Sequence, residues 1–299
     1  MVYQSSQTSS FAPQQVFAYS ETNQRENNED SFQVITITPT MSQRIPLLCV
    51  ADGMGGHEHG ELVSREVLQS LGSSLFSSLS IARSLNFPPE EIAPVTLEEL
   101  GEAISDGIYL ANQRIQRIVE QNHWQLAGST LVIAAILDDT VIAANLGDSP
   151  LFHYQADSKQ VRKVTDDHTV AGILLKVGMI SDEMARHHEG RNRLQYFVGC
   201  ADLPREIIPV HTFSIAPEDI LLLCSDGVSG SLSTEELTAI FTIPTASLSE
   251  LAERLIAAAQ EKGETDNQTL ILWSGRDRTP DTMITKPQIK AKPWWIERG

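Results

Sequence analysis

Two apolar segments of the chain each run into an Asp-Gly pair. LLCVADGMGG spans 47–56 and LLLCSDGVSG spans 221–230. A short apolar run bounded by glycine is typical of a buried strand, so we expect Asp52 and Asp226 at the ends of core strands. An unpaired ionised carboxylate is costly to bury, and glycine permits close backbone approach. The two pairs therefore indicate a shared cation site.

Other acidic residues also lie beside strand-like runs. Glu29 and Asp30 precede SFQVITI, Asp148 follows VIAANLG, and Asp266 precedes QTLILW. Oxygen ligands without clustered His or Cys favour Mg²⁺ or Mn²⁺ over zinc. Such a set can surround two ions roughly 3.5–4 Å apart, which clamp the attacking and leaving oxygens in phosphoester hydrolysis. A single Asp-Gly is more simply a turn or a helix cap, and only the conjunction of these sites favours a metal centre.

Seven motifs follow one another along the chain. They are Arg25-x-x-Asn-Glu-Asp30, Asp52-Gly-Met-Gly-Gly, Gly128-Ser-Thr, Asn-Leu-Gly-Asp148-Ser, Thr165-x-Asp-His, Cys-Ser-Asp226-Gly and Thr-Asp266-Asn. Their order and approximate spacing resemble the metal-dependent type-2C protein serine/threonine phosphatases, from about residue 16 to 273. The Asp-Gly-Met-Gly-Gly form is similar to the bacterial branch of that family.

The resemblance implies hydrolysis of phosphoserine and phosphothreonine in phosphorylated protein substrates by a metal-activated water. Two Mg²⁺ or Mn²⁺ ions are implied, with a third as a further possibility. The implied metal ligands are Glu29, Asp30, Asp52, the carbonyl of Gly53, Asp148, Asp226 and Asp266. Asp52 would bridge the two main ions and is implied to be catalytic, and Asp148 would belong to the third ion. Arg25 would bind the phosphate, because a guanidinium fork matches phosphate oxygens; a lone Arg is otherwise a solvated surface residue.

The chain departs from the family pattern at two positions. Met54 stands where eukaryotic relatives carry a His that is thought to protonate the leaving group, so the general acid stays open. His57 is the nearest candidate, although a His in a glycine-rich loop is more often a helix-end or surface group. Pro150 stands where the family usually carries an Arg, directly after Gly-Asp-Ser. Because of these departures, an alternative remains in which the chain is a regulatory module that binds phosphorylated proteins without hydrolysing them; turnover separates the two readings. His168 is expected to be structural.

The elements that position these residues are expected to form an α+β fold. The pattern predicts three consecutive strands in an antiparallel meander between roughly 129 and 154, with a turn at Asp138-Asp139. Apolar spacing predicts a helix over 97–118 with a capping box from Thr96 to Glu99, and further helices over 61–79 and 249–260. Because LLCVA and LLLCS are apolar on both faces, both need cover on both faces. We therefore expect a four-layer αββα sandwich of two mainly antiparallel sheets flanked by helices.

Domain organisation follows from composition. Residues 1–15 are rich in Ser and Gln and are expected to be disordered; 16–275 form the catalytic domain, with a flap at about 168–213. In the flap, Arg191 and Arg193 are candidates to attract the phosphorylated segment, with a solvated surface as the alternative. The 276–299 tail holds six Lys or Arg and three acids, so it has a net charge of +3, and it includes Trp294-Trp295. It could dock on the acidic body or on a partner, or be a frayed terminus.

Overall charge and hydropathy exclude several classes of protein. The formal net charge is -17 and the sequence pI is about 4.8, which argues against nucleic-acid binding. No apolar run of 18 or more residues and no basic-then-apolar leader is present, so we expect no membrane association and a cytoplasmic location. The three cysteines do not form a disulfide framework; Cys49 and Cys224 are expected in the core, and Cys200 is ambiguous. We expect a monomer.

Overall fold

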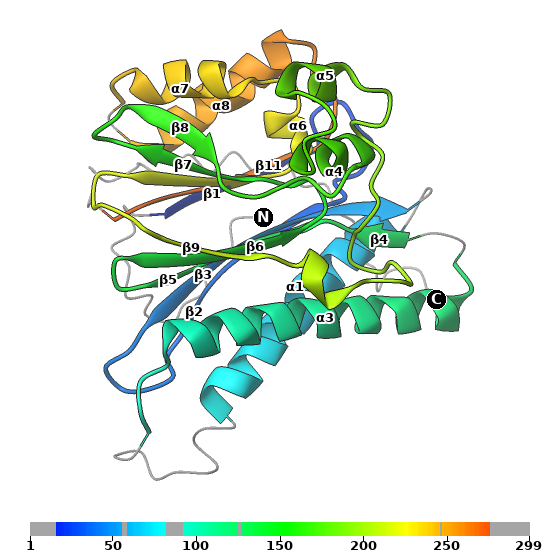
Figure 1. Ribbon diagram of the computed structural model, residues 1–299, viewed down its shortest axis with the longest axis vertical. Helices are drawn as coiled ribbons and strands as arrows, with labels where there is room; N and C mark the ends of the chain where they lie inside the picture. Colours follow the sequence, from blue (N-terminus) through cyan, green and yellow to red (C-terminus); the bar gives the residue numbers. More distant parts are fainter. Residues whose placement is uncertain (1–15, 56–58, 82–91, 125–126, 246, 276–299) are drawn as a thin grey trace, which may run out of the picture.

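The computed structural model describes residues 16–55, 59–81, 92–124, 127–245 and 247–275. Two antiparallel sheets stack face to face, and helices cover the outer face of each (Figure 1). The predicted α+β, four-layer αββα sandwich is therefore confirmed. The expectations for 1–15, for 276–299 and for His57 concern residues outside those described. No helix in the described part of the chain combines the length and apolar character needed to cross a membrane.

The two sheets have different strand orders. The larger sheet runs β2-β3-β5-β6-β9, with β4 paired to β3, and the smaller runs β1-β11-β10-β7-β8. The strands of the larger sheet are β2 (Asp30–Ile37), β3 (Ile45–Gly55), β4 (Ala127–Ser129), β5 (Leu131–Leu137), β6 (Thr140–Leu146) and β9 (Val210–Ser214). Those of the smaller sheet are β1 (Val16–Glu21), β7 (Leu151–Gln155), β8 (Gln160–Lys163), β10 (Ile220–Cys224) and β11 (Gln268–Ser274).

Long helices form the outer layers. On the larger sheet lie α1 (Gly60–Phe76), which a π-helical turn continues over Ser77–Ile81, and α3 (Leu97–Asn122); on the smaller sheet lie α7 (Thr234–Thr242) and α8 (Leu248–Glu261) (Figure 1). The short helices are α4 (Val170–Lys176), α5 (Asp182–His187), the 3-10 turn η3 (Arg205–Ile207) and α6 (Asp226–Ser229). The predicted capping box is confirmed: Thr96 caps α3 and Glu99 bonds back to it. The helix extends four residues beyond the predicted end.

Three apolar clusters explain why the central strands are apolar on both faces. Alternate residues of β3 point to opposite sides: Leu47 and Cys49 pack with α1 and α3, whereas Leu48 and Val50 face the other sheet. In β10, Cys224 likewise belongs to the cluster under α7 and α8. Both cysteines are fully buried core residues and carry no disulfide, as predicted.

The predicted three-strand meander is wrong in its third member. β5 and β6 do form a hairpin whose turn is Asp138-Asp139, and Asp138 adopts a left-handed φ of 55°. β7, however, pairs with β10 and β8 in the other sheet. The chain crosses between the sheets at 147–150, where Gly147 has a φ of 111° and Pro150 has no N–H to give to a ladder. Apolar alternation alone does not distinguish a neighbour in the same sheet from a strand facing it.

Candidate metal centre

Asp30 and Asp52 meet on adjacent strands of the larger sheet. They are directly opposite each other in the β2–β3 register. The expectation that Asp52 ends its strand is wrong, because β3 continues to Gly55. Up to Val50 the strand pairs with β5, and from Gly53 onward it pairs with β4. Asp52 therefore lies opposite Thr130, the one residue between β4 and β5, and the N–H of Thr130 donates to the carbonyl oxygen of Asp52 at 2.8 Å.

Asp226 and Asp266 come from the smaller sheet. As predicted, Asp226 follows the end of a core strand: β10 ends at Cys224, and Asp226 is the first residue of α6. Asp266 lies two residues before β11. The two segments touch through backbone, since a Cβ atom on Gly227 would lie 2.0 Å from the carbonyl oxygen of Asn267. Only glycine permits this approach, which brings the two carboxylates to the same end of the sandwich.

Glu29 is brought to Asp52 by a second close backbone contact. The N–H of Gly53 donates to the carbonyl oxygen of Glu29 at 3.1 Å. A Cβ atom on Gly53 would lie 2.1 Å from the carbonyl oxygen of Gly60, at the start of α1. The segment before β2, the end of β3 and the start of α1 therefore pack around one point, which holds the predicted ligands Glu29 and Gly53 next to Asp52.

The carboxylates of this cluster destabilise one another's charged forms. Burial, followed by the charges of Asp30, Asp226, Asp148 and Asp266, raises the pKa of Asp52 well above its usual range. Burial is also the main cause that raises the pKa of Asp30 to about 7, although a hydrogen bond from Ser225 opposes it. The same cause raises the pKa of Asp148 to about 8 and that of Asp226 to about 6. Such mutual effects require close range, so the structure brings these predicted residues together.

The donor set fits a hard divalent cation. Every predicted side-chain ligand is a carboxylate, which is the donor type that Mg²⁺ and Mn²⁺ prefer. Asp30 Oδ1 is buried and has no hydrogen-bond partner within the described structure, as expected of a ligand atom. Among the described residues, no three His, Cys, Asp or Glu side chains already stand in a metal-binding arrangement. The fit therefore rests on donor chemistry and on the convergence of the acids.

Arg25 reaches the same centre from the loop between β1 and β2. Its Nη2 lies 2.6 Å from Asp266 Oδ2, and 58% of its side chain is exposed. The residue predicted to bind phosphate is thus paired with a predicted metal ligand. Because an exposed ion pair contributes little free energy, this contact leaves the guanidinium able to exchange partners.

Asn267 fixes the loop that carries Arg25 and Glu29, a role that the sequence analysis missed. Its Nδ2 donates to the carbonyl oxygens of Thr22 at 3.1 Å and Asn27 at 2.9 Å. Its Oδ1 accepts from the N–H of Glu29 at 2.8 Å. One buried amide therefore ties both ends of this loop to the Asp266 segment. The only signal in the sequence is its place within the Thr-Asp-Asn motif.

Two hydroxyl groups next to predicted ligands were also missed. Ser225 Oγ donates to Asp30 Oδ2 at 2.7 Å and so joins the two sheets at the centre. Thr130 Oγ1 accepts from the N–H of Asp52 at 3.0 Å and shares a hydrogen bond of 2.6 Å with Ser149 Oγ. Both lie in motifs already singled out, but their function follows only from partners that are distant in the sequence.

His168 is a buried structural residue, as expected. Its Nδ1 accepts from the N–H of Gly147 at 3.1 Å, and its own N–H donates to the carbonyl oxygen of Gly147 at 2.9 Å. Burial is the main cause that lowers its pKa to about 4, so the ring is neutral near pH 7. The carbonyl oxygen of His168 accepts from the N–H of Gln195 at 2.8 Å. The flap is thereby attached to the residue that precedes Asp148.

The described structure shows contacts of two residues that flank His57 in the sequence, Met54 and His59. Met54 pairs with Gly128 in the β3–β4 ladder. His59, which precedes α1, stacks on Trp124 with ring centroids 4.0 Å apart. His57 itself lies outside the described residues, so its role stays a prediction.

Comparisons with known proteins give matches in both sequence and fold. A family model described as protein phosphatase 2C matches residues 19–268. A serine/threonine phosphatase stp from Listeria innocua is 31% identical over 252 residues, which is 83% of this chain and 90% of the relative. The fold resembles a serine/threonine phosphatase structure from S. agalactiae, with a TM-score of 0.71, 24% identity and coverage of 86% and 97% of the two chains. It also resembles the catalytic domain of the phosphatase PstP in complex with two manganese ions, with a TM-score of 0.65, 25% identity and coverage of 87% and 96%.

Proposed function

The chain belongs to the protein phosphatase 2C family, and we propose from this that it hydrolyses phosphoserine and phosphothreonine in proteins. The observation that carries the proposal is the meeting of Asp30 and Asp52 from one sheet with Asp226 from the other. Carboxylates buried together at such a point need a cation. The bacterial relatives with phosphatase names support the same reaction.

We propose a divalent metal centre at this point. The residues that would hold two Mg²⁺ or Mn²⁺ ions are Glu29, Asp30, Asp52, the carbonyl of Gly53, Asp226 and Asp266, and Asp148 would serve a third ion. The related structure of PstP in complex with two manganese ions supports this proposal. When bound, such ions supply a nucleophilic hydroxide near neutral pH and stabilise charge on the phosphoryl oxygens.

Arg25 would bind the phosphate by leaving Asp266. Its guanidinium can offer two parallel N–H groups to phosphate oxygens, and the contact with Asp266 already brings it to the centre. A cation held by the carboxylate of Asp266 would lower its attraction for Arg25, and the guanidinium would then be available to the substrate. Asn267 would act as a positioning residue, since its three hydrogen bonds fix the loop from which Arg25 and Glu29 extend.

The flap would bind the peptide around the phosphorylated residue. Arg191 and Arg193 are both exposed, and their backbones are held in place: the N–H of Arg191 donates to His188, and the carbonyl oxygen of Arg193 accepts from the N–H of Val170. Through His168 the same segment is fixed to Gly147, next to Asp148. Two positive charges on an anchored loop near an acidic centre would attract an anionic substrate segment.

The test is release of inorganic phosphate from a phosphothreonine peptide with added Mn²⁺ or Mg²⁺. We expect metal-dependent release that EDTA abolishes and that Asp52→Asn lowers by at least about 100-fold. Asp157→Asn is a matched control, because Asp157 is exposed in the turn between β7 and β8, and should leave the rate unchanged. If the wild-type chain binds the metal and the phosphopeptide without releasing phosphate, the hydrolase proposal is wrong and the chain is the phosphoprotein-binding module. The monomeric state and cytoplasmic location stay predictions from the sequence.

A further inference from the structure

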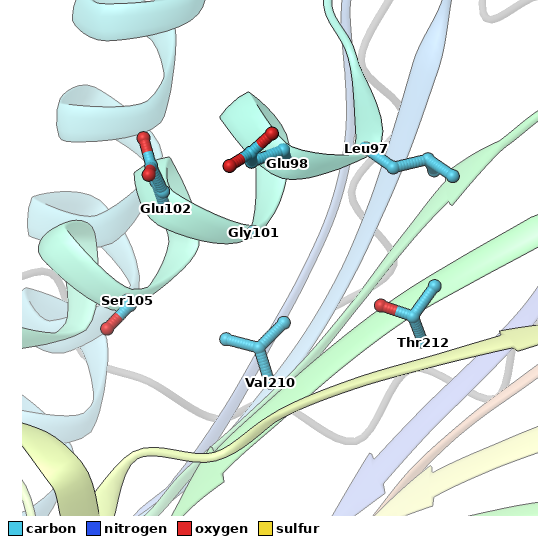
Figure 2. Close-up of a pocket in the computed structure, with 7 residues that line it drawn as sticks. All are labelled: Leu97, Glu98, Gly101, Glu102, Ser105, Val210 and Thr212. Atoms are coloured by element: carbon cyan, nitrogen blue, oxygen red, sulfur yellow. The ribbon is translucent and has the colours of Figure 1, made fainter.

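An open groove lies on the outer face of the larger sheet, away from the acidic centre. It has a volume of about 370 Å³ and runs between the first turns of α3 and the edge strand β9. Figure 2 shows Val210 and Thr212 of β9 across from the start of α3, which carries Glu98 and Glu102. The full lining is Leu97, Glu98, Gly101, Glu102, Ser105, Val210 and Thr212.

β9, the strand that forms one wall of the groove, has a free edge. β9 pairs with β6 on one side only, and no other described strand pairs with it. Two apolar side chains are exposed beside this edge, Val210 at 37% and Leu97 at 40%. An exposed edge strand with an apolar groove is a template for pairing with another extended segment, and proteins normally cover such edges.

The chain leaves the described structure beside this strand. Ser274 Oγ donates to the carbonyl oxygen of Pro217 at 3.4 Å, and a Cβ atom on Gly275 would lie 3.1 Å from Pro217 Cα. Pro217 is three residues beyond Ser214, the last residue of β9. The 24 residues from 276 to 299 therefore begin next to the end of β9, and about 3.3 Å per extended residue lets them pass along the whole strand.

The composition of this tail complements the groove. Six basic and three acidic residues give 276–299 a net charge of +3, whereas the remainder carries -20, since -17 minus +3 is -20. The stretch 282–292, TMITKPQIKAK, contains Lys286, Lys290 and Lys292 and no acidic residue. Its first four residues include the β-branched Thr282, Ile284 and Thr285, which favour an extended strand.

We propose that residues 282–292 of the tail dock in the groove between β9 and α3. The backbone of 282–286 adds an antiparallel strand to the free edge of β9, because the tail enters at the Ser214 end. Its lysines then face the carboxylates of Glu98 and Glu102. Pro287 ends the paired segment. Its lack of an N–H is tolerated there, because an edge strand need not donate on its outer side.

Amide hydrogen exchange of the full chain tests this docking. In the wild-type protein we expect slow exchange of the β9 amides that point away from β6. Lys286→Gln/Lys290→Gln/Lys292→Gln in the tail and Glu98→Lys/Glu102→Lys in the groove should each accelerate that exchange by about tenfold or more. The matched control is Glu120→Lys/Glu253→Lys, which makes the same charge change at exposed positions on α3 and α8 and should leave β9 unchanged. Circular dichroism melts verify that each variant is folded.

Carbodiimide cross-linking of the wild-type chain, read by mass spectrometry, identifies the occupant. Docking predicts links from the tail lysines to Glu98 or Glu102 within a monomer, at a yield that does not depend on protein concentration. Links mainly to other carboxylates, such as Glu218, would overturn the proposal. So would links found only in a dimer, since the edge would then pair with a second copy. Equal β9 exchange in the wild type and in the tail variant would also contradict it.

Discussion

Asp30 and Asp52 face each other directly across the β2–β3 pair, at the end of the sandwich where the smaller sheet contributes Asp226. Like charges opposite each other on neighbouring strands are destabilising. Burial adds to this effect and raises the pKa of both groups. The metal-free fold therefore carries an unfavourable free energy at this point, which a divalent cation would relieve.

The first prediction concerns stability with and without metal. Mn²⁺ should raise the unfolding temperature of the wild-type chain, because a ligand at about 100 times its Kd adds about 2.7 kcal/mol to the free energy of unfolding. In EDTA, Asp52→Asn should unfold at the same or a higher temperature than the wild type, since it removes one of the repelling charges. The variant should also lose most of the Mn²⁺ shift. Thermal melts followed by circular dichroism measure both effects.

The exposed variant Asp157→Asn is the control for that experiment. It should keep the wild-type melting temperature in EDTA and the full response to Mn²⁺. A normal Mn²⁺ shift in Asp52→Asn would show that Asp52 is not needed for metal binding and would contradict the proposed ligand set.

The second prediction compares two glycines. Gly227→Ala should lower the free energy of unfolding by about 1–3 kcal/mol, as expected for overpacking, because its Cβ would meet the Asn267 carbonyl oxygen at 2.0 Å. Gly101→Ala should instead raise it by about 0.5–1 kcal/mol, since Gly101 lies inside α3 and its nearest contact would be Val210 Cγ1 at 3.4 Å. Urea denaturation gives both values. An unchanged or higher free energy of unfolding in Gly227→Ala would mean that the close approach at Gly227 relaxes without cost.

The third prediction tests the flap. Arg191→Glu/Arg193→Glu should raise KM for a phosphothreonine peptide by about three- to tenfold, with little change in kcat, because these charges attract substrate without touching the reacting atoms. The effect should shrink as salt is added. Arg44→Glu/Arg117→Glu changes the charge equally at exposed positions elsewhere and should leave KM unchanged. An unaltered KM in the flap variant would exclude this role.

The layers of the fold could be predicted because they depend on short-range patterns. The alternation of Leu47, Leu48 and Cys49 requires cover on both faces of the sheet, and the Thr96–Glu99 spacing defines a helix start that the structure reproduces. The assignment of β7 to a sheet could not be predicted in this way. Its apolar residues are satisfied equally well beside β6 or across from it, and the crossover at Gly147 decides between the two.

The candidate site shows the same limit. Asp226 and Asp266 stand out in the sequence because each is an acid at the edge of an apolar run. Asn267 and Ser225 do not stand out, since their importance lies in hydrogen bonds to partners far away in the sequence. Asn267 bonds to residues 238 to 245 positions away, and Ser225 to Asp30, 195 positions away. Supporting residues of a site become visible only when its segments are folded together.

A buried, hydrogen-bonded His–Asp pair lies at the opposite end of the smaller sheet from the acidic centre. His153 Nε2 and Asp219 Oδ2 are 2.8 Å apart, and Asp219 also accepts from the N–H groups of Ala156 and Ala216. Burial is the main cause that lowers the pKa of His153, against the attraction of Asp219. For Asp219, burial alone would raise the pKa, but the two backbone donors and His153 outweigh it, so its pKa is lowered.

Both shifts predict that acid destabilises this end of the sandwich. A group whose pKa is lower in the folded state stabilises the fold above its unfolded pKa and loses that contribution as pH falls, because the unfolded chain then binds more protons. The His153 contribution should therefore be lost as pH falls below about 6.5, its ordinary value, and that of Asp219 only below about 4. Urea denaturation at several pH values should show that His153→Gln, which keeps a donor toward Asp219, loses less stability than the wild type between about pH 7 and pH 5. Asp219→Ala should cost about 3 kcal/mol at pH 7, since it leaves the buried His153 ring and two backbone N–H groups without their acceptor. Parallel pH profiles for the wild type and His153→Gln would mean that His153 does not titrate differently in the folded and unfolded states.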